Sequence, residues 1–249
     1  MTRPRTTILL TLLLALDCHS PGYSQSRHSD VMVTVMKDKI VALSAGGSGG
    51  EESLGVNETV VTTGARGHTG FAQTTNRLLG FSSGLRRWTE ILLGVEEKVE
   101  RHQILPALIL VQSDRQVYGY QEGRGHWTSK ALGTSETVKQ IRGRGHIAVA
   151  LTTERALAFS SYTGGFFSIP WSTDERAQTI DETGDAVMIR TSTRTLAFRS
   201  QTTEWIEVRQ AEDRYILPSS NSIASAQVEA GGSDVTATPR FFAISSRRP

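Results

Sequence analysis

Short hydrophobic segments separated by polar turns recur along this chain at a fixed step. Four of them end on an aromatic residue, and these end residues lie 39 positions apart each time: Phe81, Tyr120, Phe159 and Phe198. Residues 40–43 match upstream at a step of 38, and residues 241–244 match downstream at a step of 46, after a Ser/Gly-rich insert. A fixed period of this length is the signature of repeat architectures. The six copies, called anchor segments below, therefore predict a repeat protein.

Four further positions keep the same step. A bulky aromatic residue follows each anchor segment, a hydroxyl residue precedes it, a chain-bending residue lies further upstream, and a glutamate opens the unit. These residues are, in the same order, Trp88, Trp127, Phe166 and Trp205; Thr74, Ser113, Thr152 and Thr191; Gly67, Pro106, Gly145 and Gly184; Glu58, Glu97, Glu136 and Glu175. Agreement at several independent positions makes the repeat specific.

Each unit is predicted to be β rather than α. Its apolar stretches are short, rich in Val, Ile, Thr and aromatic residues, and bounded by Gly, Ser and Thr clusters. The unit at 136–173 predicts four strands, at 138–141, 147–152, 155–160 and 166–169, joined by turns. Only residues 92–102 have a helix-like composition. In the other repeat units, the equivalent positions (called a column where they share one place in the repeat) are predicted to form a strand.

Four short strands in every 39 residues resemble the blades of β-propeller repeat families, such as WD-repeat, kelch and tachylectin-like proteins. The resemblance covers residues 31–249 and is architectural, since no Trp-Asp dipeptide or kelch double glycine keeps step with the repeat. It implies an all-β propeller with four-stranded blades. The small residue before each anchor aromatic, such as Gly119 or Ala158, fits that fold because facing sheets can then interdigitate.

Six anchor segments favour six blades, with repeats near 31–56, 58–95, 97–134, 136–173, 175–211 and 213–249. The first copy lacks a recognisable Glu-x-Val strand, and the last copy ends at Pro249 without a fourth strand. Five blades are the alternative, if these two incomplete copies share one blade. In either arrangement we expect N- and C-terminal strands to close the ring, which removes exposed sheet edges.

The N-terminal residues 1–24 have the pattern of a secretory signal peptide. Arg3 and Arg5 precede an apolar run at 8–16 that is too short to span a bilayer, and small residues follow. Cleavage after Ser24 would leave a single propeller domain at 25–249, exported to the periplasm or beyond the cell. A minor alternative is a lipoprotein anchored through Cys18. No other segment is long and apolar enough for a transmembrane helix.

Charge and cysteine content narrow the function classes. The predicted mature chain carries 25 basic and 24 acidic residues, which gives no electrostatic case for nucleic acid as a partner. Cys18 is the only cysteine and would be removed, so neither a disulfide nor a thiolate metal site is expected. Among the histidines there is no zinc-binding spacing, and no glycine-rich phosphate loop is present. We therefore expect no metal and no cofactor.

Two sets of residues are candidates for binding. The aromatic column offers Trp88, Trp127 and Trp205, either as rings that stack on a ligand or as packing between blades. The triplet Arg-Gly-His occurs at Arg66–His68 and Arg144–His146 in one column, with turn chemistry as the alternative. The repeated glutamates lie too far apart and are too alike to act as an acid/base pair, so no catalytic residue is predicted. Their expected role is structural, as hydrogen-bond acceptors or as residues that solvate a turn, and the alternative is a ring of acceptors at one mouth of the channel.

These features together predict an exported, non-enzymatic, monomeric binding or scaffold propeller that presents one face to a protein or carbohydrate partner. A lectin-like protein with a sugar site at each tryptophan is one form of this function. The alternative is a propeller hydrolase or lyase whose residues come from several blades around the channel mouth.

Overall fold

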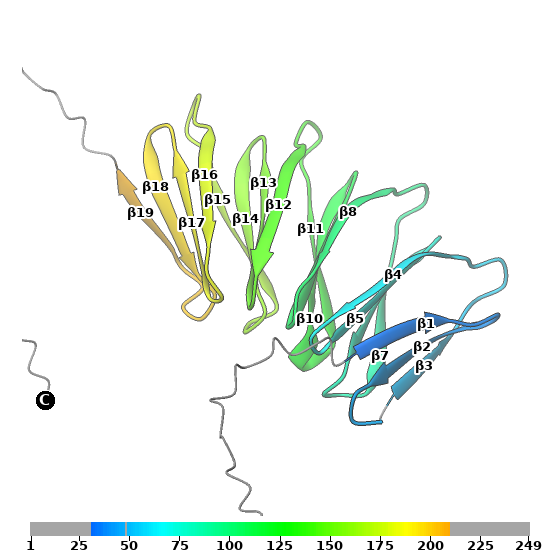
Figure 1. The fold of residues 1–249 in the computed structure, drawn as a ribbon. Coiled ribbons are helices and arrows are strands. Elements are labelled where there is room, and N and C mark those ends of the chain that lie inside the picture. Colours follow the sequence, from blue (N-terminus) through cyan, green and yellow to red (C-terminus); the bar gives the residue numbers. More distant parts are fainter. Residues whose placement is uncertain (1–30, 48, 210–249) are drawn as a thin grey trace, which may run out of the picture. The chain divides into compact units, whose positions relative to one another are not determined.

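A computed structural model describes residues 31–47 and 49–209 of this chain. Within them lie nineteen strands and one 3-10 helix (Glu122–Arg124), and the strands form five antiparallel sheets (Figure 1). The all-β prediction is confirmed. The predicted signal peptide, Cys18 and the anchor segment at 241–244 lie outside the described residues.

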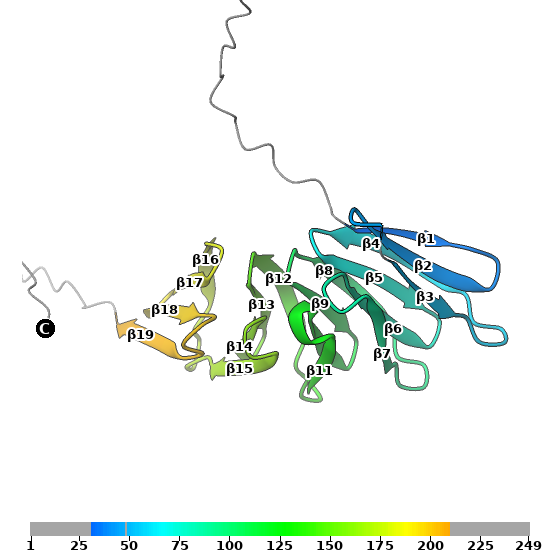
Figure 2. The same ribbon diagram turned by 90° about the horizontal axis from the view of Figure 1, so that it is seen from below.

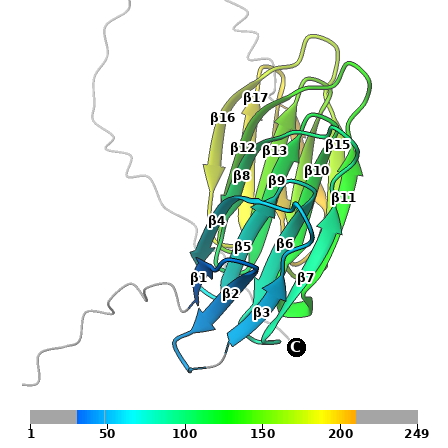
Figure 3. The same cartoon turned by 90° about the vertical axis from the view of Figure 1, so that its right-hand side faces the viewer.

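The sheets follow one another along the chain, and each is a simple meander. Sheet 1 contains β1 (Val31–Val35), β2 (Lys39–Ser44) and β3 (Gly49–Ser53); sheet 2 contains β4 (Val60–Arg66), β5 (Thr69–Thr74), β6 (Arg77–Ser82) and β7 (Arg87–Leu92). Sheet 3 contains β8 (Val99–Ile104), β9 (Leu108–Ser113), β10 (Gln116–Gln121) and β11 (His126–Ala131). Sheet 4 contains β12 (Val138–Arg144), β13 (Ile147–Thr152), β14 (Arg155–Ser160) and β15 (Gly165–Pro170); sheet 5 contains β16 (Ala177–Glu182), β17 (Ala186–Thr191), β18 (Arg194–Arg199) and β19 (Trp205–Arg209). Figure 3 shows β4, β5, β6 and β7 side by side in this order.

The 39-residue register corresponds closely to the sheets. Every anchor segment from 40–43 to 195–198 forms the third strand of a full sheet or its equivalent, β2, in sheet 1. The two middle strands predicted for the unit at 136–173 have the observed bounds, whereas the outer strands are longer than predicted. Residues 92–102 contain the end of β7 and the start of β8, and no helix. Sheet 1 has three strands, as expected from its missing Glu-x-Val motif.

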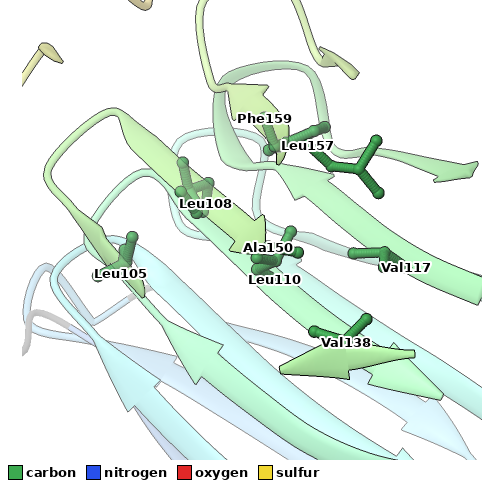
Figure 4. Close-up of a cluster of buried hydrophobic side chains, with 9 residues drawn as sticks. Leu105, Leu108, Leu110, Val117, Val138, Ala150, Leu157 and Phe159 are labelled. Atoms are coloured by element: carbon green, nitrogen blue, oxygen red, sulfur yellow. The ribbon is translucent and has the colours of Figure 1, made fainter. Parts of the chain in front are cut away.

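Consecutive sheets pack face to face, and their side chains make the core. Between sheets 3 and 4, Leu108, Leu110 and Val117 meet Ala150, Leu157 and Phe159 in a cluster of fully buried side chains (Figure 4). Similar clusters join sheet 1 to sheet 2, sheet 2 to sheet 3, and sheet 4 to sheet 5, following the chain order visible in Figure 2. Each internal sheet is thus covered on both faces by its neighbours.

Small residues in the anchor segments permit this close approach. A Cβ added to Gly119 would lie 2.3 Å from the Phe159 ring of the next sheet, and one added to Gly80 would lie 2.5 Å from the Tyr120 ring. The predicted role of this small residue is confirmed at these two positions. Meanders of four strands that pack face to face in chain order are the blades of a β-propeller.

Sheet 5 differs from the internal sheets because one of its faces is not covered within the described residues. Met188, Ile206 and Val208 are 41%, 49% and 60% exposed, whereas Val149, which occupies the column of Met188 in sheet 4, is 1% exposed. Strands β17 and β18 accordingly alternate between buried and more accessible residues. No helix in the part of the chain that the structure describes is long and apolar enough to cross a membrane.

Candidate functional site

The tryptophan column lies in the interfaces between sheets. Trp88, Trp127 and Trp205 each begin or nearly begin the fourth strand of a sheet and donate the indole N–H to a backbone carbonyl of the preceding sheet. The donor–acceptor distances are 3.0, 3.1 and 3.2 Å, to Gly50, Thr89 and Phe167. Trp88 and Trp127 are buried and Trp205 is half-buried.

Each of these rings also packs on the anchor aromatic of its own sheet. The ring centroids of Trp127 and Tyr120 are 5.1 Å apart, and those of Trp88 and Phe81 are 5.3 Å apart. A buried ring whose polar edge is already bonded has little surface for a ligand. The geometry favours the packing interpretation, and ligand binding by this column stays a prediction.

The Arg-Gly-His triplets form the hairpin turns between the first and second strands of sheets 2 and 4. Gly67 and Gly145 have φ values of +57° and +59°, a left-handed conformation that glycine adopts without strain. Nδ1 of His146 lies 2.9 Å from Oγ of Ser161, and Nδ1 of His68 lies 3.3 Å from Oγ of Ser83. Because the pair recurs in two sheets, together with a bond from the serine N–H to the histidine carbonyl, it serves to fix the turn.

The neighbouring arginines, Arg66 and Arg144, are exposed. These turns define one end of the sheets, called the Gly-turn end below, which also carries the loops between the third and fourth strands. The opposite end, called the connection end, carries the turns between the second and third strands and the links from one sheet to the next.

At the Gly-turn end of sheet 4, His146 belongs to a group of unlike side chains. Its ring stacks on Tyr162, with centroids 4.7 Å apart and planes 23° apart. The Tyr162 hydroxyl donates to Oδ1 of Asp185 in the adjacent turn of sheet 5, at 3.1 Å. Tyr162 is 40% exposed, and Asp185 is exposed as well. We call His146, Ser161, Tyr162 and Asp185 the His146 turn cluster.

Sequence reasoning identified His146 but missed Tyr162 and Asp185. The signal that could have found them is departure from the repeat. Position 162 is glycine in the two preceding units, Gly84 and Gly123, and the column of Asp185 holds histidine or alanine elsewhere. A large aromatic residue and a carboxylate therefore appear where the repeat does not require them.

The cluster offers an accessible aromatic face, a carboxylate and an imidazole at one surface. This arrangement suits recognition by hydrogen bonding and ring contact. It is not arranged for nucleophilic catalysis, because Ser161 is buried and its histidine contact is shared with the equivalent turn of sheet 2. Within the described residues, no three His, Cys, Asp or Glu side chains are grouped to hold a metal ion.

The repeated glutamates lie at the connection end and are bonded within the protein. The Glu175 carboxylate accepts bonds of 2.8 Å from Nε and from a terminal nitrogen of Arg194, one of 2.6 Å from the Thr191 hydroxyl, and one of 2.7 Å from the Ser172 N–H. The same terminal nitrogen of Arg194 donates to the Pro170 carbonyl of sheet 4 at 2.7 Å. Each such arginine therefore ties its own sheet to the one before it.

The arrangement recurs with Glu58 and Arg77 and with Glu136 and Arg155. Sheet 3 has Gln116 at the arginine position, and there the Tyr118 hydroxyl donates to Glu97 at 2.8 Å instead. These carboxylates are satisfied by internal partners, which favours the structural interpretation over a ring of acceptors open to a ligand.

Comparisons with known proteins find distantly similar solved structures. Similar solved structures, all β-propellers, include human WBSCR16 (TM-score 0.38, 10% identity, covering 70% of this chain and 60% of that one), Prp20p from Saccharomyces cerevisiae (0.37, 8%, 69% and 56%) and BamB from Moraxella catarrhalis (0.30, 14%, 72% and 60%). The chain spans about three fifths of the length of these structures. No family model and no curated protein matches the sequence.

Replacing Trp127 by alanine tests whether its ring packs between two sheets or binds a ligand. If the ring holds sheets 2 and 3 together, Trp127→Ala should lower the free energy of unfolding by about 3–5 kcal/mol, the usual cost of truncating a buried tryptophan. Urea denaturation of both proteins measures the difference. An unchanged unfolding midpoint, combined with loss of a sugar or protein ligand, would instead establish the ligand-binding interpretation.

The Glu175 network should make stability depend on acid pH. Burial alone would raise the pKa of Glu175, but the bonds from Arg194, Thr191 and the Ser172 N–H and the guanidinium charge together lower it to about 2. The unfolded value is about 4.3. Glu175 therefore stabilises the fold above about pH 4, and this contribution disappears as the pH falls toward 2.

Glu175→Gln should accordingly cost about 2–3 kcal/mol at pH 6 and progressively less as the pH approaches 2. Unfolding free energies measured across this range give the comparison. The exposed Glu204→Gln is the matched control and should stay within about 0.5 kcal/mol of the parent. A cost for Glu175→Gln that does not change with pH would contradict the low pKa.

Proposed function

We propose that this chain is an exported, non-enzymatic binding or scaffold protein that presents the Gly-turn end of its sheets to a protein or glycan partner. The observation that carries the proposal is the His146 turn cluster. It combines a partly exposed aromatic ring, an imidazole and a carboxylate drawn from two sheets. Conserving the repeat would not require Tyr162 or Asp185, so their presence on an open surface beside His146 supports recognition.

Export is part of the proposal and rests on the N-terminal sequence. A basic start, an apolar run at 8–16 and small residues before position 25 support a signal peptide. Anchoring through Cys18 is the other way in which such a chain would reach the cell envelope. The hydrolase or lyase alternative has no supporting group of residues within the described part of the chain.

Ring closure is the structural part of the proposal. The accessible apolar face of sheet 5 carries residues whose equivalents in sheet 4 are covered by the next sheet, as Val149 and Met188 illustrate. The anchor segment at 241–244 continues the register, so we propose that residues after 209 provide the sheet that covers this face. Six blades would result, or five if that segment completes sheet 1.

Ligand capture with matched variants tests the binding function. His146→Ala combined with Tyr162→Gly and Asp185→Ala removes the cluster, and glycine already occupies the Tyr162 position in two units. Wild type and variant are immobilised and exposed to envelope proteins of the source cells and, separately, to a glycan array. We expect ligands retained by wild type to be lost from the variant.

Thr75→Ala with Asp114→Ala changes exposed side chains at the connection end and should leave retention unchanged. Equal retention by all three proteins, or no selective ligand at all, would show that the cluster is not a recognition surface. Chemical conversion of a retained ligand would move the assignment to the enzymatic alternative.

Truncation tests ring closure. Deleting residues 233–249 removes the last anchor segment, so a closed ring would lose a sheet and expose apolar faces and strand edges, which invites aggregation. We expect loss of soluble, cooperative folding, as followed by size-exclusion chromatography and thermal melting. In an open array each repeat contacts only its neighbours; a monomeric truncated protein that melts within a few degrees of the parent would therefore disprove closure.

A further inference from the structure

A pocket of about 410 Å³ lies at the connection end between sheets 4 and 5. Leu151 and Ala177 contribute apolar surface, Trp171 forms a wall, and Lys139, Thr153 and Arg176 add polar groups. This volume falls within the range of small-molecule sites in proteins. The pocket is at the opposite end of the sheets from the His146 turn cluster, so it is independent of the function proposed above.

Two residues that line the pocket depart from the repeat. Trp171 stands where the three preceding units have leucine, and Ala177 stands where they have valine: Leu54, Leu93 and Leu132; Val60, Val99 and Val138. The smaller alanine leaves space beside the strand, and the larger indole borders it.

The chemistry of the lining is apolar on one side and cationic on the other. The indole N–H of Trp171 donates to the Thr152 carbonyl at 2.9 Å, so the polar edge of the ring is bonded and its remaining surface is carbon. Glu175, the carboxylate that lines the pocket, is already paired with Arg194. Lys139 and Arg176, both exposed, therefore give this site an unbalanced positive charge.

We propose that this pocket binds an acidic sugar, namely a uronate ring of an oligosaccharide. The apolar C–H face of the ring would lie on Trp171, and its carboxylate would be bound by Arg176 and Lys139, since guanidinium groups form strong bonds with carboxylates. The Thr153 hydroxyl accepts the Thr137 N–H at 3.1 Å and still has a proton to donate to a sugar hydroxyl.

An acidic peptide is the competing ligand. Extended peptides gain most of their affinity from main-chain bonds along a sheet edge or groove. The pocket is instead a local hollow beside a single aromatic wall, which suits one ring of a sugar better than a strand of peptide.

Calorimetric titration tests the proposal with tetragalacturonate and a glucuronate-containing tetrasaccharide as probes. A neutral galactose tetrasaccharide and an Asp/Glu-rich hexapeptide are the comparison ligands. We expect at least one of the two uronates to bind, the neutral sugar and the peptide to bind at least tenfold more weakly, and added salt to weaken uronate binding.

Variants that restore the residues of the other units give the sharpest test. Trp171→Leu and Ala177→Val should fold normally, because the sister units contain those residues at the same positions, and each should weaken uronate binding by more than tenfold. Arg176→Thr should weaken it about tenfold, and threonine occupies this column at Thr59 and Thr137. The matched control is Lys98→Thr, a cation in the same column two units earlier, which should bind as wild type does.

The outcomes separate the alternatives. Failure of both uronates to bind, or binding that Trp171→Leu and Ala177→Val leave unchanged in folded protein, would overturn the site. Equal binding of the neutral sugar would remove the cationic part of the proposal and thereby the assignment to uronates. Tighter binding of the acidic peptide, with the same sensitivity to Arg176→Thr, would assign the pocket to a peptide and refute the sugar.

Discussion

The packing of an anchor aromatic ring onto the small residue of the preceding sheet sets the spacing on which the structure depends. The Phe159 ring lies where a Cβ on Gly119 would have to be, and the Tyr120 ring stands in the same relation to Gly80. A four-stranded sheet cannot bury both of its faces by itself, so this contact joins one sheet to the next. Because the contact brings the two backbones close together, it also brings polar groups of one sheet within reach of the carbonyls of the other.

Two sets of polar bonds use that proximity. In the first set, the indole N–H of a tryptophan in the fourth strand of one sheet, such as Trp127, donates to a backbone carbonyl of the preceding sheet. In the second set, an arginine at the connection end, such as Arg194, binds a glutamate of its own sheet and a backbone carbonyl of the preceding sheet. A buried carboxylate such as Glu175 would be costly without its partners. It is tolerated because the repeat supplies a guanidinium, a hydroxyl and a backbone N–H together. The glutamate column, for which a structural role was expected, therefore joins neighbouring sheets.

The sequence was sufficient for the middle strands of the unit at 136–173 and for the 39-residue step because one packing constraint is repeated in every unit. The strands at 147–152 and 155–160 could be placed to the residue, since their apolar pattern, turn residues and columns all agree. The site was harder to foresee for the same reason. Columns show what the units share, whereas Tyr162 and Asp185 meet across two sheets, and only the fold brings a loop of one unit beside a turn of the next. Trp127 and Gly145, in contrast, each belong to a column of similar residues that recurs in the other units. Ring packing and turn formation could therefore be considered for them from the sequence alone.

In a repeat protein, function is best sought where a unit departs from its sisters without a structural need to do so. Gln116 replaces an arginine, but Tyr118 takes over the bond to Glu97, so that change is compensated locally. Trp171 and Ala177 differ, because they line a pocket of about 410 Å³. The cations Lys139 and Arg176 line the same pocket, and its carboxylate, Glu175, is paired with Arg194. Tyr162 likewise places an aromatic ring on an accessible surface where glycine would serve the turn. A substitution that a neighbouring residue compensates, such as Gln116, preserves the packing of the sheets. A substitution that is not compensated and lies at the surface costs free energy of folding, and binding to another molecule can offset that cost.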